Sequence, residues 1–237
     1  MKKHSKSYNE RVALVDRDKS YPPQAALQLV KQTARTVFDE TVELHMRTGS
    51  DPRQADQLIR GVVTLPHGLG RQLRVIVFAT GEGASSAREA GADFVGVDDL
   101  IERIEGGWVD FDTAIATPDI MGRLGRLGRV LGRKGLMPNP RTGTVVQPGD
   151  LSKTVEEAKK GRLEYRMDRN AGIHSVIGKA SFTPEQLLEN MATLVGSIVR
   201  QRPSSVKGQF IVSAFLTTTM GPSIRLDVPT TLSLGVE

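Results

Sequence analysis

Two glycine-rich segments are the first candidates for chemistry, because such segments cradle phosphate groups in nucleotide-binding enzymes. Residues 81–86 (GEGASS) follow an apolar run, where a dinucleotide-binding turn would stand. However, Ser86 takes the place of the third Gly or Ala, and Val95 and Gly96 stand where an acidic residue would bind the ribose. Residues 128–135 are one residue short of a phosphate-binding loop and lack its Lys-Ser or Lys-Thr ending. An ordinary β-to-α turn at Gly81 is favoured, and a nucleotide-dependent α/β enzyme that uses this turn is the alternative.

Acid–base and metal chemistry have little support in the sequence. There is no cysteine, and the histidines are scattered, with no His-Glu-x-x-His pair: His4, His45, His67 and His174. The carboxylate pairs at 98–99 and 110–112 have no cofactor signature beside them, so solvated loop and helix-cap roles are favoured. No nucleophile elbow is present. We therefore predict a protein that is not an enzyme and that has no catalytic residues, metal or cofactor.

The charge distribution favours a polyanionic partner. The chain has a net charge of +5 and a pI of about 9.6. One segment, residues 121–141, has no acidic residue and six basic ones: Arg123, Arg126, Arg129, Arg133, Lys134 and Arg141. Upstream, residues 88–119 contain nine carboxylates and two arginines. On charge alone, the segment 121–141 is the first candidate for binding RNA.

The same segment can also be interpreted as an amphipathic helix that packs on its own sheet. At helical spacing its arginines form one stripe, and Leu124, Leu127 and Leu131 form the adjacent one. Its interior glycines each cost about 1 kcal/mol relative to Ala, so the segment is a poor autonomous helix. Close approach of its backbone to another surface is one reason to tolerate them. Packing and RNA contact are compatible.

The elements that must position these residues fall into three stretches. The first has a helix over 22–36 and a strand over 38–47, in which Val42, Leu44 and Met46 alternate with polar residues. The second begins with a nearly continuous apolar run, 73–79, and continues in a β-α-β-α-β rhythm that predicts a parallel sheet covered on both faces. The third has strands over 163–167 and 172–179, a helix over 184–200, and a strand pair over 210–226 bent at 219–222.

The later strands alternate like those of the first stretch, which predicts an α/β protein of two domains. Residues 1–67 and 160–237 form a discontinuous α+β sandwich domain, and residues 68–159 form an inserted Rossmann-like domain with a parallel sheet. Linkers that carry Gly or Pro would then act as a hinge. No window is apolar enough to span a membrane, and no apolar core follows the basic N-terminus, so we expect a cytoplasmic protein with no membrane partner.

Residues 127–145 (LGRVLGRKGLMPNPRTGTV) resemble the signature of bacterial ribosomal protein L-one, a family of the mobile stalk beside the tRNA exit site of the large subunit. Further motifs in the same order extend the resemblance over nearly the whole chain: 38–41 (FDET), 51–57 (DPRQADQ), 64–68 (TLPHG), 106–108 (GGW), 116–119 (ATPD) and 219–222 (TMGP). The resemblance implies two α/β domains, binding to large-subunit rRNA, help in releasing deacylated tRNA from the exit site, and repression of the protein's own mRNA. It also implies a monomer outside the ribosome.

The resemblance moves the principal RNA surface from the basic segment to the first domain. The residues it implies there are Phe38, Thr41, His174, Lys179, Thr217, Thr219, Met220 and Gly221. Hydroxyl and N–H groups would meet phosphate and 2′-OH groups, Phe38 and Met220 would offer flat apolar contact, and Gly221 would let the backbone come close. Core packing is the alternative for Phe38 and Met220. The six basic residues of 121–141 become a secondary RNA-binding set.

Two departures from the family pattern affect these expectations. Val37 stands where the family has a basic residue, so one phosphate contact is lost or moved to Arg35. A Pro-Arg pair of the signature is replaced by Arg133-Lys134, which frees a backbone N–H and adds a charge.

Overall fold

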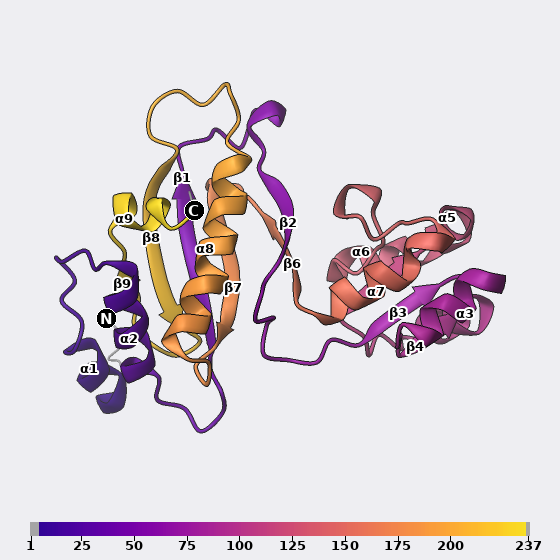
Figure 1. Cartoon of the computed structure of the whole chain (residues 1–237), viewed down its shortest axis with the longest axis horizontal. Coiled ribbons are helices and arrows are strands. Elements are labelled where there is room, and N and C mark those ends of the chain that lie inside the picture. The colour runs from indigo at the N-terminus through magenta and orange to yellow at the C-terminus, as the bar shows by residue number, and fades with distance from the viewer. Residues whose placement is uncertain (1–4, 236–237) are drawn as a thin grey trace. The chain divides into compact units, whose positions relative to one another are not determined.

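The computed structural model describes residues 5–235 (Figure 1). The chain divides into two compact units: unit 1 runs up to Gly70 and resumes at Leu163, and unit 2 is Arg71–Arg162. The division expected from the sequence lies three residues earlier at each crossing. Strands β2 (Arg60–Thr64) and β6 (Arg162–Arg166) form a two-stranded sheet at the crossings, where Arg60 Nη2 donates to Glu164 Oε1 at 2.6 Å.

Unit 1 is built on a four-stranded sheet in the order β7-β1-β8-β9, antiparallel throughout. These strands are β7 (Gly172–Lys179), β1 (Thr41–Thr48), β8 (Ile211–Thr218) and β9 (Ile224–Arg225). The predicted alternation in β1 is confirmed, because Val42, Leu44 and Met46 are buried. The residues between them are exposed or half-buried and form the open face of the sheet.

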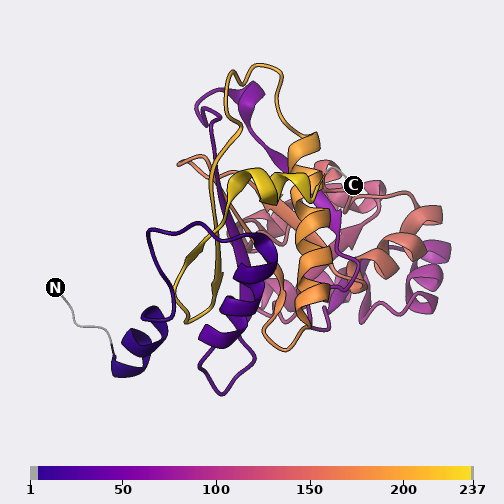
Figure 2. The ribbon, with the colours of Figure 1, turned by 60° about the vertical axis from the view of Figure 1, so that its left-hand side comes forward.

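Helices α2 (Pro23–Thr33), α8 (Pro184–Arg200) and α9 (Val228–Ser233) pack on the other face of this sheet (Figures 1 and 2). The predicted helix 184–200 is confirmed: Thr183 and Gln186 form a capping box at its start, and its apolar side chains are buried at helical spacing. Helix α2 ends three residues earlier than predicted. The reason is that the N–H groups of Arg35 and Thr36 donate to the carboxylate of Glu40 instead of continuing the helix. Two short elements complete the unit, α1 (Lys6–Val12) and η1 (Ala55–Gln57).

Unit 2 is a three-stranded parallel sheet in the order β4-β3-β5, as the sequence predicted. The strands are β3 (Val75–Phe78), β4 (Phe94–Gly96) and β5 (Thr113–Ala116). Ile76 and Phe78 face a layer made by α4 (Asp98–Glu105), α5 (Pro118–Leu124), η2 (Gly125–Leu127) and α6 (Gly128–Lys134). Val75 and Val77 face a second layer, made by α3 (Gly81–Glu89) and α7 (Leu151–Lys159). Both faces of β3 are therefore covered, which explains its uninterrupted apolar sequence.

Short 3-10 turns, η3 (Pro140–Thr142) and η4 (Pro148–Asp150), connect α6 to α7. None of the helices described in residues 5–235 has the length and apolar character that crossing a membrane requires.

Candidate nucleic-acid interface

Seven of the eight residues expected to bind RNA lie at one end of the unit 1 sheet, where β1 begins and β7 and β8 end. Thr41 pairs with Lys179, whose Nζ donates to Thr41 Oγ1 at 2.9 Å. The N–H of Thr41 donates to Thr219 Oγ1 at 2.9 Å, and its carbonyl oxygen accepts from the N–H of Thr219 at 3.1 Å. We call this end of the sheet, with the loops 34–40 and 219–222, the loop edge.

A buried carboxylate holds the two loops of this edge together. Glu40 is 1% exposed, and its Oε1 accepts hydrogen bonds from the N–H groups of Arg35 at 2.8 Å and Thr36 at 3.0 Å. Its Oε2 accepts from the N–H of Met220 at 3.0 Å. Burial raises the pKa of Glu40, but hydrogen bonds to the ionised form outweigh burial and lower the pKa to about 2. Glu40 is therefore anionic at neutral pH, and it fixes the loops without touching solvent.

The tethered loops present apolar side chains to solvent. Phe38 is 55% exposed and Met220 is 46% exposed, so core packing, the alternative considered for both, is wrong. Val37 is fully exposed. Arg35, the proposed replacement for the missing cation at Val37, reaches across the loop edge, where its Nε donates to the carbonyl oxygen of Met220 at 3.3 Å. Exposed flat side chains on fixed loops are suited to contact with bases and sugars.

Gly221 and Thr217 have roles inside the turn. A Cβ on Gly221 would lie 2.3 Å from Thr218 Oγ1, so a larger residue at this position requires the Thr218 side chain or the turn to shift. The expectation that Gly221 serves the approach of RNA is therefore not needed to explain the residue. Thr217 Oγ1 donates to the carbonyl oxygen of Thr218 at 3.0 Å and also lies within the turn.

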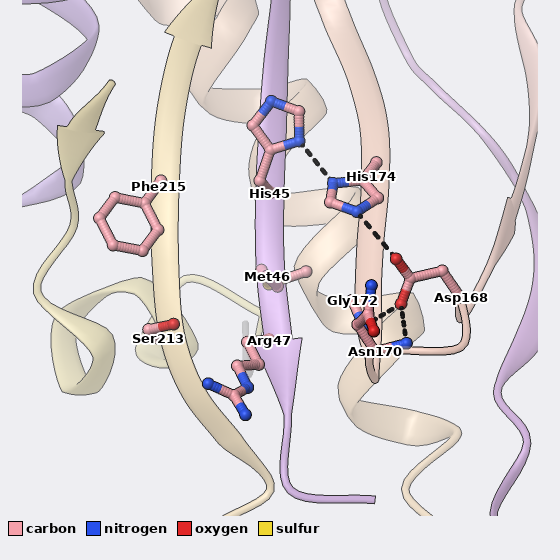
Figure 3. Close-up of a pocket in the computed structure, with 9 residues that line it drawn as sticks. All are labelled: His45, Met46, Arg47, Asp168, Asn170, Gly172, His174, Ser213 and Phe215. Carbon is pink, nitrogen blue, oxygen red and sulfur yellow. Dashed lines mark hydrogen bonds and ion pairs between the residues drawn. The ribbon is translucent and has the colours of Figure 1, made fainter. Parts of the chain in front are cut away.

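His174, the eighth residue, lies further along the open face. Its Nδ1 is 2.8 Å from Nδ1 of His45 on the neighbouring strand, and its Nε2 is 3.5 Å from Asp168 Oδ2 (Figure 3). At this distance one ring nitrogen donates and the other accepts, so the pair carries one proton between the two Nδ1 atoms. Burial and the nearby His174 lower the pKa of His45, and Glu43 opposes them.

The histidine pair lies in an open pocket of about 680 Å³ that also includes Arg47, Asp168, Ser213 and Phe215 (Figure 3). The sequence pointed to His174 but not to His45 or Phe215 as site residues. The alternation of β1 placed His45 on the open face of the sheet. The strand register puts His45 between His174 and Phe215, and this register could not be predicted from the sequence.

The basic segment of unit 2 forms α5, η2 and α6. Leu124, Leu127 and Leu131 are buried in the core of unit 2, which confirms the amphipathic interpretation for that side. Two of the basic side chains are engaged by α4: Arg123 forms an ion pair with Asp98, and Arg126 Nη1 lies 3.7 Å from Glu105 Oε1. The other four form no ion pair within residues 5–235 and are exposed: Arg129, Arg133, Lys134 and Arg141.

Contacts within the chain do not explain most of the glycines in this segment. An added Cβ at Gly122, Gly125, Gly128 or Gly132 would meet nothing within 4 Å in the described structure. Gly135 differs, because it ends α6 with φ of +70°, a conformation that favours glycine. Gly122 and Gly132 lie inside α5 and α6, where each costs about 1 kcal/mol relative to Ala, while Gly125 and Gly128 begin η2 and α6. Neither packing nor backbone conformation within the described chain explains them.

No His, Asp and Glu side chains of residues 5–235 gather in a group of three that could hold a metal ion. Unit 1 thus combines an open sheet face with an exposed loop edge, in a chain whose net charge is +5.

The chain belongs to the Ribosomal protein L1p/L10e family, whose profile matches residues 29–222. It is 57% identical over 233 residues to the Large ribosomal subunit protein uL1 of Thermomicrobium roseum, which is 98% of this chain and 97% of that protein. The protein of the same name from Beutenbergia cavernae is 55% identical over 237 residues, 100% of this chain and 99% of the relative. That from Dehalococcoides mccartyi is 51% identical over 232 residues, 98% of both chains.

Family membership confirms three predictions made from the sequence. The chain is a protein of the large ribosomal subunit, it works in the cytoplasm as part of the ribosome, and it is not an enzyme. The alternative of a nucleotide-dependent enzyme that uses the Gly81 turn is thereby overturned.

Proposed function

We propose that this chain binds large-subunit rRNA through the loop edge and the open sheet face of unit 1. The observation that carries the proposal is the Glu40 network, which holds Phe38 and Met220 exposed on loops that are already ordered. Ordered loops lose little conformational freedom on binding, so contacts made by their side chains translate into affinity. Lys179 and Thr41 at the same edge supply an amine and a hydroxyl for phosphate and 2′-OH groups.

Alanine substitution of Phe38 and Met220 tests this proposal, with Leu58→Ala as the matched control because Leu58 is also an exposed apolar residue of unit 1, at 51%. If each side chain contacts a base or sugar, Phe38→Ala and Met220→Ala each weaken binding about 5- to 100-fold, the range for one aromatic or apolar base contact. Binding is measured by fluorescence anisotropy with transcribed large-subunit rRNA. Binding equal to that of Leu58→Ala, in variants that remain folded, would contradict the assignment of this edge.

We further propose that unit 1 contacts exit-site tRNA and assists its release. The support is a second concavity, of about 560 Å³, at the opposite end of β1, whose lining includes Arg47, Arg53 and Arg169 and one carboxylate, Asp51. The test is the rate at which deacylated tRNA leaves ribosomes reconstituted with an Arg53→Glu, Arg169→Glu variant. Slower release with unchanged incorporation into the subunit is expected, and an unchanged rate would refute this role.

We also propose that the loop edge binds the chain's own mRNA and represses its translation, and that the chain is a monomer outside the ribosome. One surface that recognises RNA through its backbone and sugars can accept two RNAs of similar shape. Unlabelled rRNA should therefore displace the labelled mRNA leader, and Met220→Ala should weaken both complexes alike. Simultaneous binding of both RNAs would show that they use different surfaces. Sedimentation of the isolated protein tests the monomer.

A further inference from the structure

Unit 2 presents a strongly basic strip that the proposed role of unit 1 does not use. Residues 120–149 contain six basic residues and no acidic one. Arg129, Arg133, Lys134 and Arg141 are the members of this segment that form no ion pair within the described chain. We call these four residues the α6 basic row.

The helix geometry directs the main part of this row outward. Arg129 and Arg133 are four residues apart on α6, so they share one face of the helix. Leu127 and Leu131 lie on the opposite side, buried against the sheet. Gly132 lies beside the two arginines, and the space above its Cα is open. The guanidinium groups therefore border a stretch of backbone that a partner can approach closely.

The composition of the surface distinguishes between a protein partner and a nucleic acid. Protein interfaces are usually anchored by large apolar or aromatic side chains that become buried. All the large hydrophobic residues that the structure exposes lie in unit 1: Leu14, Val37, Phe38, Leu58, Val212 and Met220. Unit 2 thus offers charge without an apolar anchor. Such a surface complements a sugar–phosphate backbone, where affinity comes mainly from neutralising phosphates.

We propose that the α6 basic row binds the backbone of a second RNA segment, separate from the one that contacts the loop edge. The proposal rests on the proposed function, because it assumes that the chain works on RNA. Arg123 and Arg126 pair with Asp98 and Glu105 of α4, so their charges are already engaged within the chain. The phosphate contacts are therefore left to the α6 basic row. Arg133 and Lys134 stand where the resembled family has a Pro-Arg pair, and the change adds a charge to this row.

The absence of cysteine from the sequence makes a site-directed crosslink the sharpest test. Arg133→Cys and, as control, Lys153→Cys each carry one photoreactive group in the full-length chain, assembled into large subunits. Lys153 is an exposed cation of α7, in the layer on the other side of the sheet. We expect the probe at position 133 to crosslink to rRNA, and the probe at 153 to crosslink at least tenfold less. Crosslinks from 133 only to protein, or equal RNA yields from both positions, would overturn the proposal.

A second measurement separates failure of this inference from failure of the proposed function. Arg129→Ala, Arg133→Ala is compared with Arg88→Ala, Lys153→Ala, which removes the same charge from α3 and α7. The first variant should lower the slope of log affinity against log salt by about 2, one for each lost phosphate contact, while the control keeps the wild-type slope. If the wild-type chain fails to bind rRNA, the proposed function is wrong. If Phe38→Ala weakens binding but the two double variants have equal slopes, only this inference is wrong.

Discussion

Replacing Glu40 with Gln removes the charge on which the two loops of the loop edge converge. Gln has nearly the same shape, but it offers one acceptor oxygen and an NH2 group in place of two acceptor oxygens. Oε1 serves Arg35 and Thr36, and Oε2 serves Met220. Whichever way the amide turns, it places NH2 against at least one backbone N–H. Buried donors without an acceptor destabilise the folded state.

The magnitude follows from the pKa of Glu40, which is about 2 in the folded protein against an ordinary value of 4.5 for this side chain. Each tenfold change in proton affinity corresponds to about 1.4 kcal/mol, so ionised Glu40 stabilises the fold by up to about 3 kcal/mol at pH 7. Because the pKa is lowered on folding, this stabilisation is complete above pH 4.5 and is lost as the pH falls towards 2. About half of it should remain near pH 3.

The assay must follow unit 1, and tryptophan fluorescence does not, because the only tryptophan, Trp108, belongs to unit 2. Hydrogen exchange at the N–H groups of Arg35 and Met220 reports directly on the network. Urea unfolding followed by circular dichroism gives the free energy of unfolding. We expect Glu40→Gln to lose about 2 to 3 kcal/mol at pH 7, and Glu10→Gln, an exposed control on α1, to lose less than about 0.5 kcal/mol. A loss at Glu40 as small as the control's, or one that stays undiminished at pH 3, would refute the reasoning.

Three further predictions follow from single contacts. Gly221→Ala should destabilise unit 1, because its Cβ would lie 2.3 Å from Thr218 Oγ1. Adding Thr218→Ala should restore part of the lost free energy of unfolding, measured in urea, and no rescue would mean that this contact is not the cause. Gly132→Ala should stabilise unit 2 by about 0.5 to 1 kcal/mol, measured by Trp108 fluorescence, because an added Cβ meets nothing within 4 Å. A loss of stability would contradict the open space at this position. Burial and His174 lower the pKa of His45, so the free energy of unfolding should decrease as the pH falls below 6.5. His45→Asn should make the free energy of unfolding depend less on pH between 7.5 and 5, and an unchanged dependence would exclude His45 as its source.

The periodic parts of unit 1 were predictable because their environment is uniform along the element. Strand β1 has one face against helices and one face open, and α8 has a continuous buried stripe, so both sequences alternate regularly. The end of α2 was not predictable from its own residues. The N–H groups of Arg35 and Thr36 donate to Glu40 instead of to helix carbonyl groups. The spacing of apolar residues along a helix does not indicate such an acceptor in the next loop.

The loop edge shows the same limit at the level of the site. The family resemblance named Thr41, Lys179, Thr219 and Met220, and the structure brings them together through the register of three strands. It did not name Glu40, although Glu40 lies inside one of the quoted motifs. The role of this carboxylate depends on Met220, 180 residues away in sequence, so only the folded chain shows why an acidic residue is buried there.

The acidic stretch upstream of the basic segment reduces the number of cations that this segment has available for a partner. Taken by sequence, the cations of 121–141 form one set, but α4 contributes Asp98 and Glu105 and thereby engages the two nearest arginines. Exposed pairs of this kind each contribute at most about 1 kcal/mol to stability, so they do not hold α5 and η2 in place by themselves.

Burial of leucine is the larger effect in this segment. Leu124, Leu127 and Leu131 are fully buried, and each contributes about 1.5 to 3 kcal/mol, against about 1 kcal/mol lost at each helical glycine. Burial of the three leucines therefore outweighs the cost of the glycines in this segment. The glycine-rich helix is thus stable on its packed side, while its outer side keeps a bare backbone beside Arg129 and Arg133. Ala at these open positions would make the helix more stable, so the presence of Gly there is a reason to look for a partner that approaches the helix from outside.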